Sequence, residues 1–87
     1  MSLEIEEFAE TIRTQQDFER FLHLLVRDCQ ENGETWENAS LPDYLAALSG
    51  FVRDLEGYYR NRHESVDLSR PAWKTFAHAL LAARVYE

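Results

Sequence analysis

The sequence predicts an all-α fold: a compact four-helix domain over residues 1–87, built on one long central helix. Three observations lead to this expectation. Leucine and alanine dominate the apolar residues, whereas valine and isoleucine, which favour strands, are few and scattered. Apolar side chains recur three and four positions apart along separate segments, as they do on one face of a helix. At 87 residues, the chain is long enough for a single small core.

The central helix is expected to begin near Leu41 and to extend to about Asn61. Ser40 precedes it and Asp43 follows Ser40 by three positions, which is the spacing of an N-terminal capping box. Pro42 suits the first turn, where its missing N–H group has no helical partner to lose. A broad apolar stripe is expected on one face: Leu41, Tyr44, Leu45, Leu48, Val52, Leu55 and Tyr59, with Phe51 on its flank.

The opposite face of this helix carries small residues, among them Ala46, Gly50 and Gly57. Glycine inside a helix costs about 1 kcal/mol relative to alanine, so these positions indicate the close approach of another backbone. The first helix of the same chain is expected to cover this face, and a second copy of the chain is the alternative. Gly57 has another interpretation, as a left-handed residue that ends the helix before Tyr58.

Two helices are predicted before the central one. The first covers residues 3–12, where apolar residues recur at helical spacing: Ile5, Phe8, Ala9 and Ile12. The second opens at Thr14 with Asp17, by the same capping rule, and ends at Gly33. Its buried stripe is expected to comprise Phe18, Phe21, Leu22, Leu25 and Cys29. Leu24 falls off this stripe and is expected to be exposed, whereas the thiol of Cys29 is expected to be buried and inert.

The last helix is predicted to start near Ser69 and Pro71, because proline is favoured in the first turn of a helix. Its apolar stripe consists of Trp73, Phe76, Ala77, Leu80 and Ala83. Val66 and Leu68 are expected to anchor the polar connection that precedes it.

The charge of the chain is uneven. Residues 1–42 carry the whole net charge of −7, whereas acids and bases balance over residues 43–87. This acidity argues against nucleic acid as a direct ligand, because phosphate would be repelled. It favours a basic protein partner, or else a solvated acidic surface that only keeps the protein in solution.

No stretch approaches the ~18 apolar residues of a membrane span, so no membrane association is expected. A single cysteine and an acidic N-terminus, unlike a signal peptide, indicate a reducing cytoplasm.

Residues typical of catalysis or metal binding are sparse. Glu19 and His23 are four apart and could touch one metal ion from a helix face. A zinc site needs three or four ligands, however, and none of the usual motifs or phosphate-binding loops is present. We therefore expect no metal, no cofactor and no enzymatic activity. The alternative is a small-molecule or metal-binding protein or a minor enzyme.

Aromatic and amide side chains form the candidate binding surface, which consists of Trp36, Glu37, Asn38, Tyr58, Tyr59 and Asn61. Tryptophan and tyrosine combine apolar area with a polar tip and recur at binding hot spots. The structural alternative is that Trp36 caps the core while Glu37 and Asn38 bond free backbone groups. Tyr58, at the edge of the central stripe, is expected to be more exposed than Tyr59.

Several short motifs of the sequence resemble those of a family of small, uncharacterised bacterial domains. They are Trp36-Glu37-Asn38, Leu41, Gly57-Tyr58-Tyr59 with Asn61, Trp73, Phe76-Ala77 and Tyr86-Glu87. The resemblance spans the chain from about Phe18 to the C-terminus. It implies a compact domain without an assigned activity, and it supplies no catalytic residues.

The predicted function is therefore that of a non-enzymatic protein-binding module. Its sharpest form is an immunity or inhibitor protein for a basic partner. A structural subunit of an assembly is a further alternative. A monomer or a weak homodimer is expected.

Overall fold

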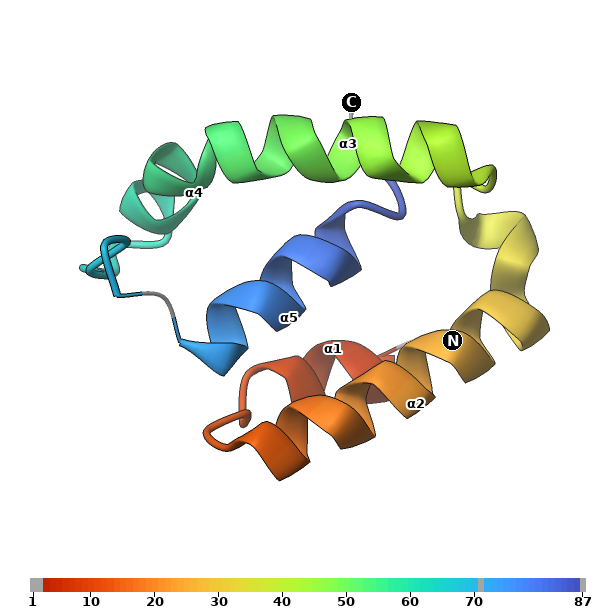
Figure 1. Cartoon of the computed structure of the whole chain (residues 1–87), viewed down its shortest axis with the longest axis horizontal. Helices are drawn as coiled ribbons and strands as arrows, with labels where there is room; N and C mark the ends of the chain where they lie inside the picture. Colours follow the sequence, from red (N-terminus) through yellow and green to blue (C-terminus); the bar gives the residue numbers. More distant parts are fainter. Residues whose placement is uncertain (1–2, 71, 87) are drawn as a thin grey trace.

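The computed structural model describes residues 3–70 and 72–86, and all regular structure in this range is helical. The elements are α1 (Leu3–Ala9), α2 (Gln15–Asn32), the 3₁₀ turn η1 (Gly33–Thr35), α3 (Leu41–Arg53), α4 (Leu55–Asn61) and α5 (Trp73–Ala82) (Figure 1). The all-α fold is confirmed, with five α-helices in the described residues where four were predicted.

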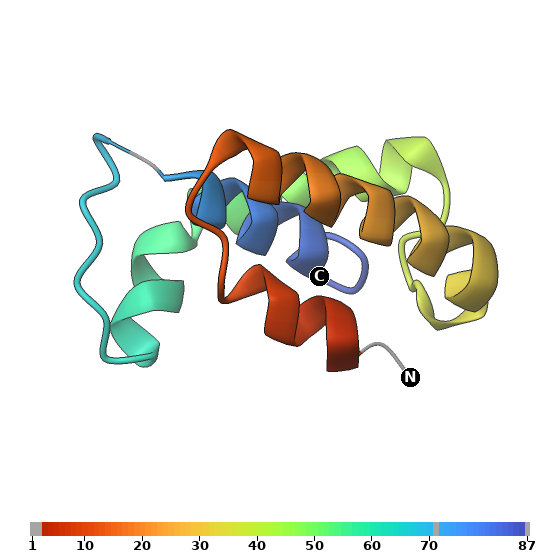
Figure 2. The same ribbon diagram turned by 90° about the horizontal axis from the view of Figure 1, so that it is seen from below.

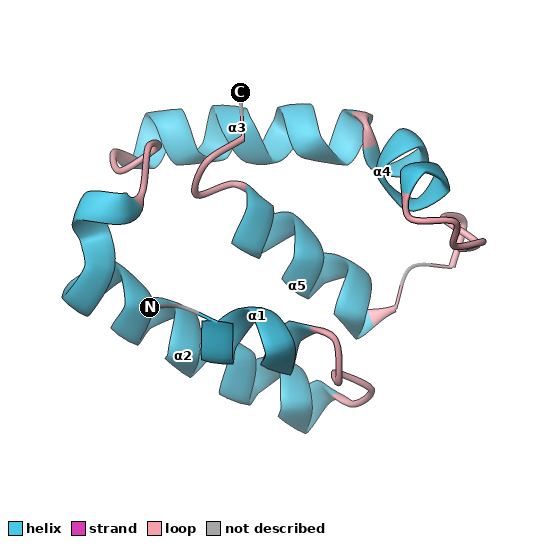
Figure 3. Ribbon diagram, turned by 180° about the vertical axis from the view of Figure 1, so that it is seen from behind, coloured by secondary structure: helices cyan, strands magenta, loops and turns pink. Residues whose placement is uncertain are grey.

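The last helix, α5, lies at the centre of the domain. It packs against α2 on one side and α3 on the other, and α1 covers α2 and α5 from behind (Figures 1 and 3). Short buried side chains explain this position, because Ala77, Ala79 and Ala83 let neighbouring helices come close. The core therefore forms around α5, although the alternation of apolar and polar residues along its sequence is less pronounced than along α3.

The predicted long helix over residues 41–61 is divided at Asp54. The N–H group of Asp54 donates to the carbonyls of Gly50 (3.2 Å) and Phe51 (3.0 Å), and its backbone then leaves the helical region. The carboxylate of Asp54 accepts hydrogen bonds from Arg53 and from the hydroxyl of Tyr86. These bonds stabilise the bend, after which α4 turns towards the start of α5 (Figure 1).

The predicted N-terminal caps of two helices are confirmed. The Thr14 hydroxyl accepts from the Asp17 N–H (3.0 Å), and the Ser40 hydroxyl accepts from the Asp43 N–H (3.2 Å). Helix α2 ends at Asn32 as expected, although the following glycine stays right-handed and continues into η1.

The start of the last helix differs from the prediction. Helix α5 begins at Trp73, and its N-cap, Ala72, offers no side-chain bond. Ser69 donates instead to the carboxylate of Asp67 (2.6 Å), which keeps it in the preceding loop. The predicted role of Pro71 lies outside the described residues. Val66 and Leu68 do anchor the connection, since both pack against the core.

Several side chains predicted to be buried are exposed, and the reverse also occurs. On α3, the side chains of Leu41, Leu45 and Val52 are exposed, because only one edge of its broad stripe meets α5. The same correction applies to other predicted stripe residues, namely Leu22, Cys29, Trp73 and Phe76. Leu24 is packed against the core instead of being exposed, because α1 covers that side of α2.

The small face of the central stretch is covered only at Gly50, because Ala46 is exposed and a Cβ atom at Gly57 would meet only Arg60 of the same helix. Helix α1 packs on α2 and α5 and makes no contact with α3. The ring of Tyr86 covers Gly50 instead, and a Cβ atom at that glycine would lie 3.5 Å from it. Gly57 lies inside α4 and has no left-handed backbone, so the interpretation as a helix-ending residue is wrong.

We expect Gly50→Ala to raise the free energy of unfolding by up to about 1 kcal/mol, because alanine is the better helix former and its methyl meets Tyr86 at ordinary contact distance. Gly50→Leu is expected to lower it by about 1–3 kcal/mol, because the longer side chain displaces the ring. Urea unfolding measures both changes. A Gly50→Leu protein as stable as Gly50→Ala would show that Tyr86 does not cover this position.

Candidate functional site

A buried carboxylate, Asp28, ties the second half of α2 to the loop after it and to the end of α5. It accepts hydrogen bonds from Asn32 Nδ2 (3.1 Å), Trp36 Nε1 (2.8 Å) and Arg84 Nη1 (2.9 Å). Asp28 and Arg84 are only 6% and 8% exposed. Burial raises the pKa of the Asp28 carboxyl, but the three donors outweigh that effect and hold the pKa below its ordinary value.

The loop between η1 and α3 is fastened by Trp36 and Asn38. The half-buried ring of Trp36 stacks on Tyr44, with ring centroids 5.6 Å apart. Asn38 donates from its side-chain amide to the carbonyls of Ala83 (3.0 Å) and Tyr86 (2.9 Å). These bonds fasten the loop to the C-cap of α5, Ala83, and to the segment that follows it. Both residues therefore have structural contacts, whatever else they bind.

The predicted tyrosines lie elsewhere, on α4. The Tyr59 hydroxyl is hydrogen-bonded to His78 Nδ1 (2.7 Å) inside the protein. Tyr58 is half-buried, and its hydroxyl accepts from Arg62 Nη1 (2.7 Å). Asn61 is exposed at the end of α4.

The structure therefore places the six candidate residues in two groups. Trp36, Glu37 and Asn38 lie in the connection from α2 to α3, at one end of the molecule. The α4 group, Tyr58, Tyr59 and Asn61, lies at the other end (Figure 1).

A second polar network joins α1, α4 and α5 through Glu10. Its carboxylate accepts from Arg62 Nη2 (3.0 Å), lies 3.1 Å from His78 Nε2 and lies 3.6 Å from Lys74 Nζ. Burial lowers the pKa of His78, and the nearby Glu10 carboxylate offsets only part of this effect. At neutral pH the imidazole is therefore uncharged, and the network serves to hold the end of α1 in place.

Three exposed acids follow one another where α2 ends. Glu31 lies in the last turn of α2, and Glu34 and Glu37 follow in η1 and in the next loop. All three side chains are exposed, and the last turn carries no basic residue. The C-terminal end of a helix is the negative end of its dipole, so acids there lower helix stability, whereas cations raise it by about 0.3–1 kcal/mol each. We call these three residues the acidic end of α2.

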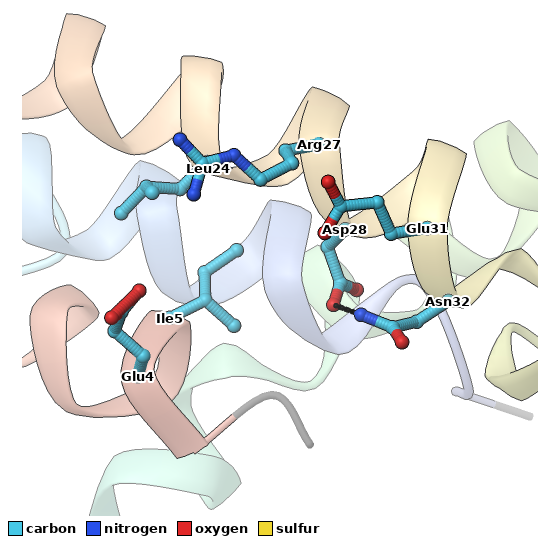
Figure 4. Close-up of a pocket in the computed structure, with 7 residues that line it drawn as sticks. All are labelled: Glu4, Ile5, Leu24, Arg27, Asp28, Glu31 and Asn32. Atoms are coloured by element: carbon cyan, nitrogen blue, oxygen red, sulfur yellow. Dashed lines mark hydrogen bonds between the residues drawn. The ribbon is translucent and has the colours of Figure 1, made fainter.

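A small pocket of 90 Å³ opens beside the acidic end, between α1 and α2 (Figure 4). Carboxylates from both helices line it, Glu4 on α1 and Glu31 on α2. Its other lining residues are Ile5, Leu24, Arg27, Asp28 and Asn32. The volume is large enough to hold ordered water molecules.

Ion pairs neutralise some acids of the first half of the chain. Arg62 and Lys74 bind Glu10, and Arg84 reaches Glu6 (3.5 Å) as well as the buried Asp28. Within residues 3–70 and 72–86, Glu4 and the acidic end form no ion pair, although Arg27 lines the same pocket as Glu4 and Glu31.

The possible metal ligands Glu19 and His23 are both exposed on α2. In the part of the chain that the structure describes, no three His, Cys, Asp or Glu side chains gather as a metal-binding group. No helix there has the length and apolar character needed to cross a bilayer.

Comparison with known proteins identifies a family. Residues 14–87 match the model of a family of unknown function, DUF7660. The chain belongs to DUF7660. No curated protein and no solved structure matches it. The expected membership in an uncharacterised domain family is thus confirmed, and the match covers α2 to α5 while α1 lies before it.

In this DUF7660 chain, Asp28→Ala is expected to lower the free energy of unfolding by about 3–5 kcal/mol, because it leaves the buried guanidinium of Arg84 without its carboxylate. Replacing both partners, as Asp28→Leu with Arg84→Met, is expected to recover much of that loss. Urea unfolding of the two single variants and the double variant measures the coupling. Strictly additive losses would mean that the pair does not act as a unit.

The stability of the domain is expected to fall as the pH drops below about 6.5, the ordinary pKa of histidine. The folded state holds the pKa of His78 lower, so the unfolded state binds a proton that the folded state rejects. A second loss is expected below about pH 4.5, where Glu10 and Asp28, whose folded pKa values are lowered, take up protons on unfolding.

Thermal unfolding measured from pH 8 to about pH 3 checks this dependence. His78→Gln is expected to remove the loss of stability that begins near pH 6.5, whereas His23→Gln, at an exposed position on α2, is expected to leave this loss unchanged. A loss of equal size in both variants would mean that another group takes up the proton.

Proposed function

We propose that this protein is a non-enzymatic protein-binding module that receives a basic protein surface at the acidic end of α2. The observation that supports the proposal is the position of Glu31, Glu34 and Glu37 at the negative end of the longest helix. Acids there oppose the helix dipole, and proteins keep such local conflicts mainly where function requires them. Lysine or arginine side chains of a partner would supply the positive charge that the helix end lacks.

Two neighbouring features favour a cationic ligand at this place. Trp36 stands between Glu34 and Glu37, and its half-buried ring offers an aromatic surface for an arginine or lysine side chain. The pocket lined by Glu4 and Glu31 adds a further carboxylate beside the acidic end, and Arg27 in the same lining neutralises part of that charge (Figure 4). Aromatic and charged groups thus lie together, as they do in many binding hot spots.

An immunity or inhibitor protein for a basic toxin or enzyme is the form of this function that fits best. A small acidic protein is drawn rapidly to a basic partner by long-range electrostatic attraction, which suits an inhibitor that must bind quickly. Its net charge of −7 on 87 residues supports such steering. The cytoplasm is the proposed compartment, on the basis of the single cysteine.

The proposal is tested with a short arginine-rich peptide added to the ¹⁵N-labelled protein, first at low and then at high salt. The indole N–H signal of Trp36 and the backbone signals of residues 31–37 are expected to shift at low salt. Screening is expected to reverse these shifts, because the Debye length falls to about 3 Å at 1 M salt. Shifts spread over all surface acids, or shifts insensitive to salt, would contradict a site at the acidic end.

The matched variants are two triple substitutions that remove the same charge. Glu31→Gln, Glu34→Gln and Glu37→Gln together are expected to weaken peptide binding and to raise the free energy of unfolding, because the unfavourable interaction with the helix dipole is removed. The control replaces Glu7, Glu19 and Glu56 with glutamine, at exposed positions away from the end of α2. If both triple variants lost the same amount of binding, the net charge of the protein, and not the acidic end, would explain the loss.

A further inference from the structure

The face of the molecule turned away from α1 is apolar across three helices. Figure 1 looks onto it, with α5 between α2 and α3, and Figures 2 and 3 show α1 on the opposite side. In the described residues, seven of the eight exposed large hydrophobic side chains lie on this outer face: Leu22, Val26, Leu41, Leu45, Val52, Trp73 and Phe76. Exposed apolar residues are normally scattered singly, so their collection on one face indicates an interface.

Contacts on α5 and α2 fix the direction of these side chains. On α5, Ala77 packs in the core that α1 completes, whereas the adjacent Phe76 is 43% exposed and points away from α1. On α2, Leu24 packs on the α1 side. Leu22 and Val26, which lie on the opposite side of that helix, are 37% and 56% exposed.

Helix α3 turns a third side outward. The Tyr44 hydroxyl donates to the Leu80 carbonyl (2.6 Å), which shows that the Tyr44 side of the helix faces α5. Gly50 lies under the ring of Tyr86, which shows that the Gly50 side faces the C-terminal segment. The remaining side carries the exposed residues Leu41, Leu45 and Val52.

Aromatic rings give the outer face a preformed centre. The Phe18 ring lies 5.4 Å from that of Trp73 and 6.2 Å from that of Phe76, measured between centroids, and Trp73 and Phe76 lie 5.9 Å apart. Rings that already pack against each other lose little conformational freedom on binding. Such a cluster is typical of the buried centre of an interface.

We infer that a second copy of this chain covers the outer face, giving a two-fold symmetric dimer. A two-fold interface pairs the same surface with itself, so the surface must be self-complementary. The seven side chains of the outer face carry no charge, although the chain has a net charge of −7, and the exposed Glu19 borders them three residues before Leu22. Contact through this face therefore brings fewer acids together than contact through α1 would, and homodimer interfaces are the most apolar class.

The outer face is also broad. It lies on the side of the molecule that measures 33 × 27 Å, whereas the thickness is 19 Å, and its seven side chains come from three helices. Each partner of a specific interface contributes roughly 800 Å², so a contact of this kind must extend over most of that side. Glu31 lines a pocket with Glu4 on the α1 side of α2, which is the far side from the outer face, so the dimer is compatible with a partner at the acidic end, and the two proposals stand independently (Figure 3).

Sedimentation velocity on the full chain, from about 5 to about 500 μM, tests the dimer over the range of weak and moderate dissociation constants. The wild-type protein is expected to shift from monomer to dimer. Leu45→Glu and Val26→Glu are each expected to raise the dissociation constant at least about a hundredfold, because a buried unpaired charge enters a two-fold interface twice.

The control is Val85→Glu, which adds the same charge at the exposed hydrophobic residue that lies off the outer face. It is expected to leave the dimer in place. Both test residues are at least half exposed, so the variants are expected to fold, and far-UV circular dichroism verifies this. A wild-type protein that stays monomeric throughout, or a dimer that tolerates Leu45→Glu and Val26→Glu, would overturn the inference.

The single native cysteine gives a second measurement that needs no variant. Cys29 is exposed on α2, three residues after Val26 and seven after Leu22, at the border of the outer face. Its rate of alkylation by a bulky maleimide is expected to fall as the protein concentration rises through the dimerisation range. A rate independent of concentration would place the contact elsewhere. The arginine-rich peptide is expected to bind Leu45→Glu as it binds the wild type, so failure of the dimer and failure of the acidic end are distinguishable.

Discussion

The fold depends above all on the carboxylate of Asp28. One buried group accepts bonds from the end of α2, from the loop that follows η1, and from the C-terminal segment after α5. Arg84 extends the same interaction to α1 through Glu6. Since each donor belongs to a different segment, the position of the acidic end relative to the rest of the molecule is set from inside the core. The surface at which a partner is proposed to bind is therefore rigidly attached to the interior.

The helices around the ion pair of Asp28 and Arg84 contribute to the domain in different ways. The alanines of α5 allow the close packing that places it at the centre. Helix α1 and the connection after it complete the core with Ile5, Ala9 and Ile12. Helices α2 and α3 each present two apolar sides, one to the core and one outward. The division of the stretch after Leu41 at Asp54 serves the same core, because α4 leaves in a new direction and brings Tyr59 to His78.

The caps at Thr14 and Ser40 could be predicted, because a cap is decided by residues three positions apart. The pairs that hold the fold together could not, since His78 lies 68 positions from Glu10, and no local pattern joins such distant residues. Hydrophobic periodicity located the apolar side of α3 but could not tell a core surface from an outward one, and Leu45 was misplaced for that reason. At the candidate site, the sequence suggested that Trp36 and Asn38 could have structural contacts, and the structure shows such contacts for both. The conflict between Glu31 and the helix dipole became visible only when the end of α2 was known.

Helix α1 has a consequence for the limits of the family. The sequence match opens at Thr14, which is the cap of α2, whereas Ile5, Ala9 and Ile12 are 4%, 0% and 3% exposed and seal the side of Phe21 and Leu25. A protein cut at the start of the match would open one wall of its core to water. The unit that similarity delimits and the unit that folds thus have different boundaries here. For this chain, a domain studied in isolation therefore needs the residues upstream of the match, or another apolar segment in their place.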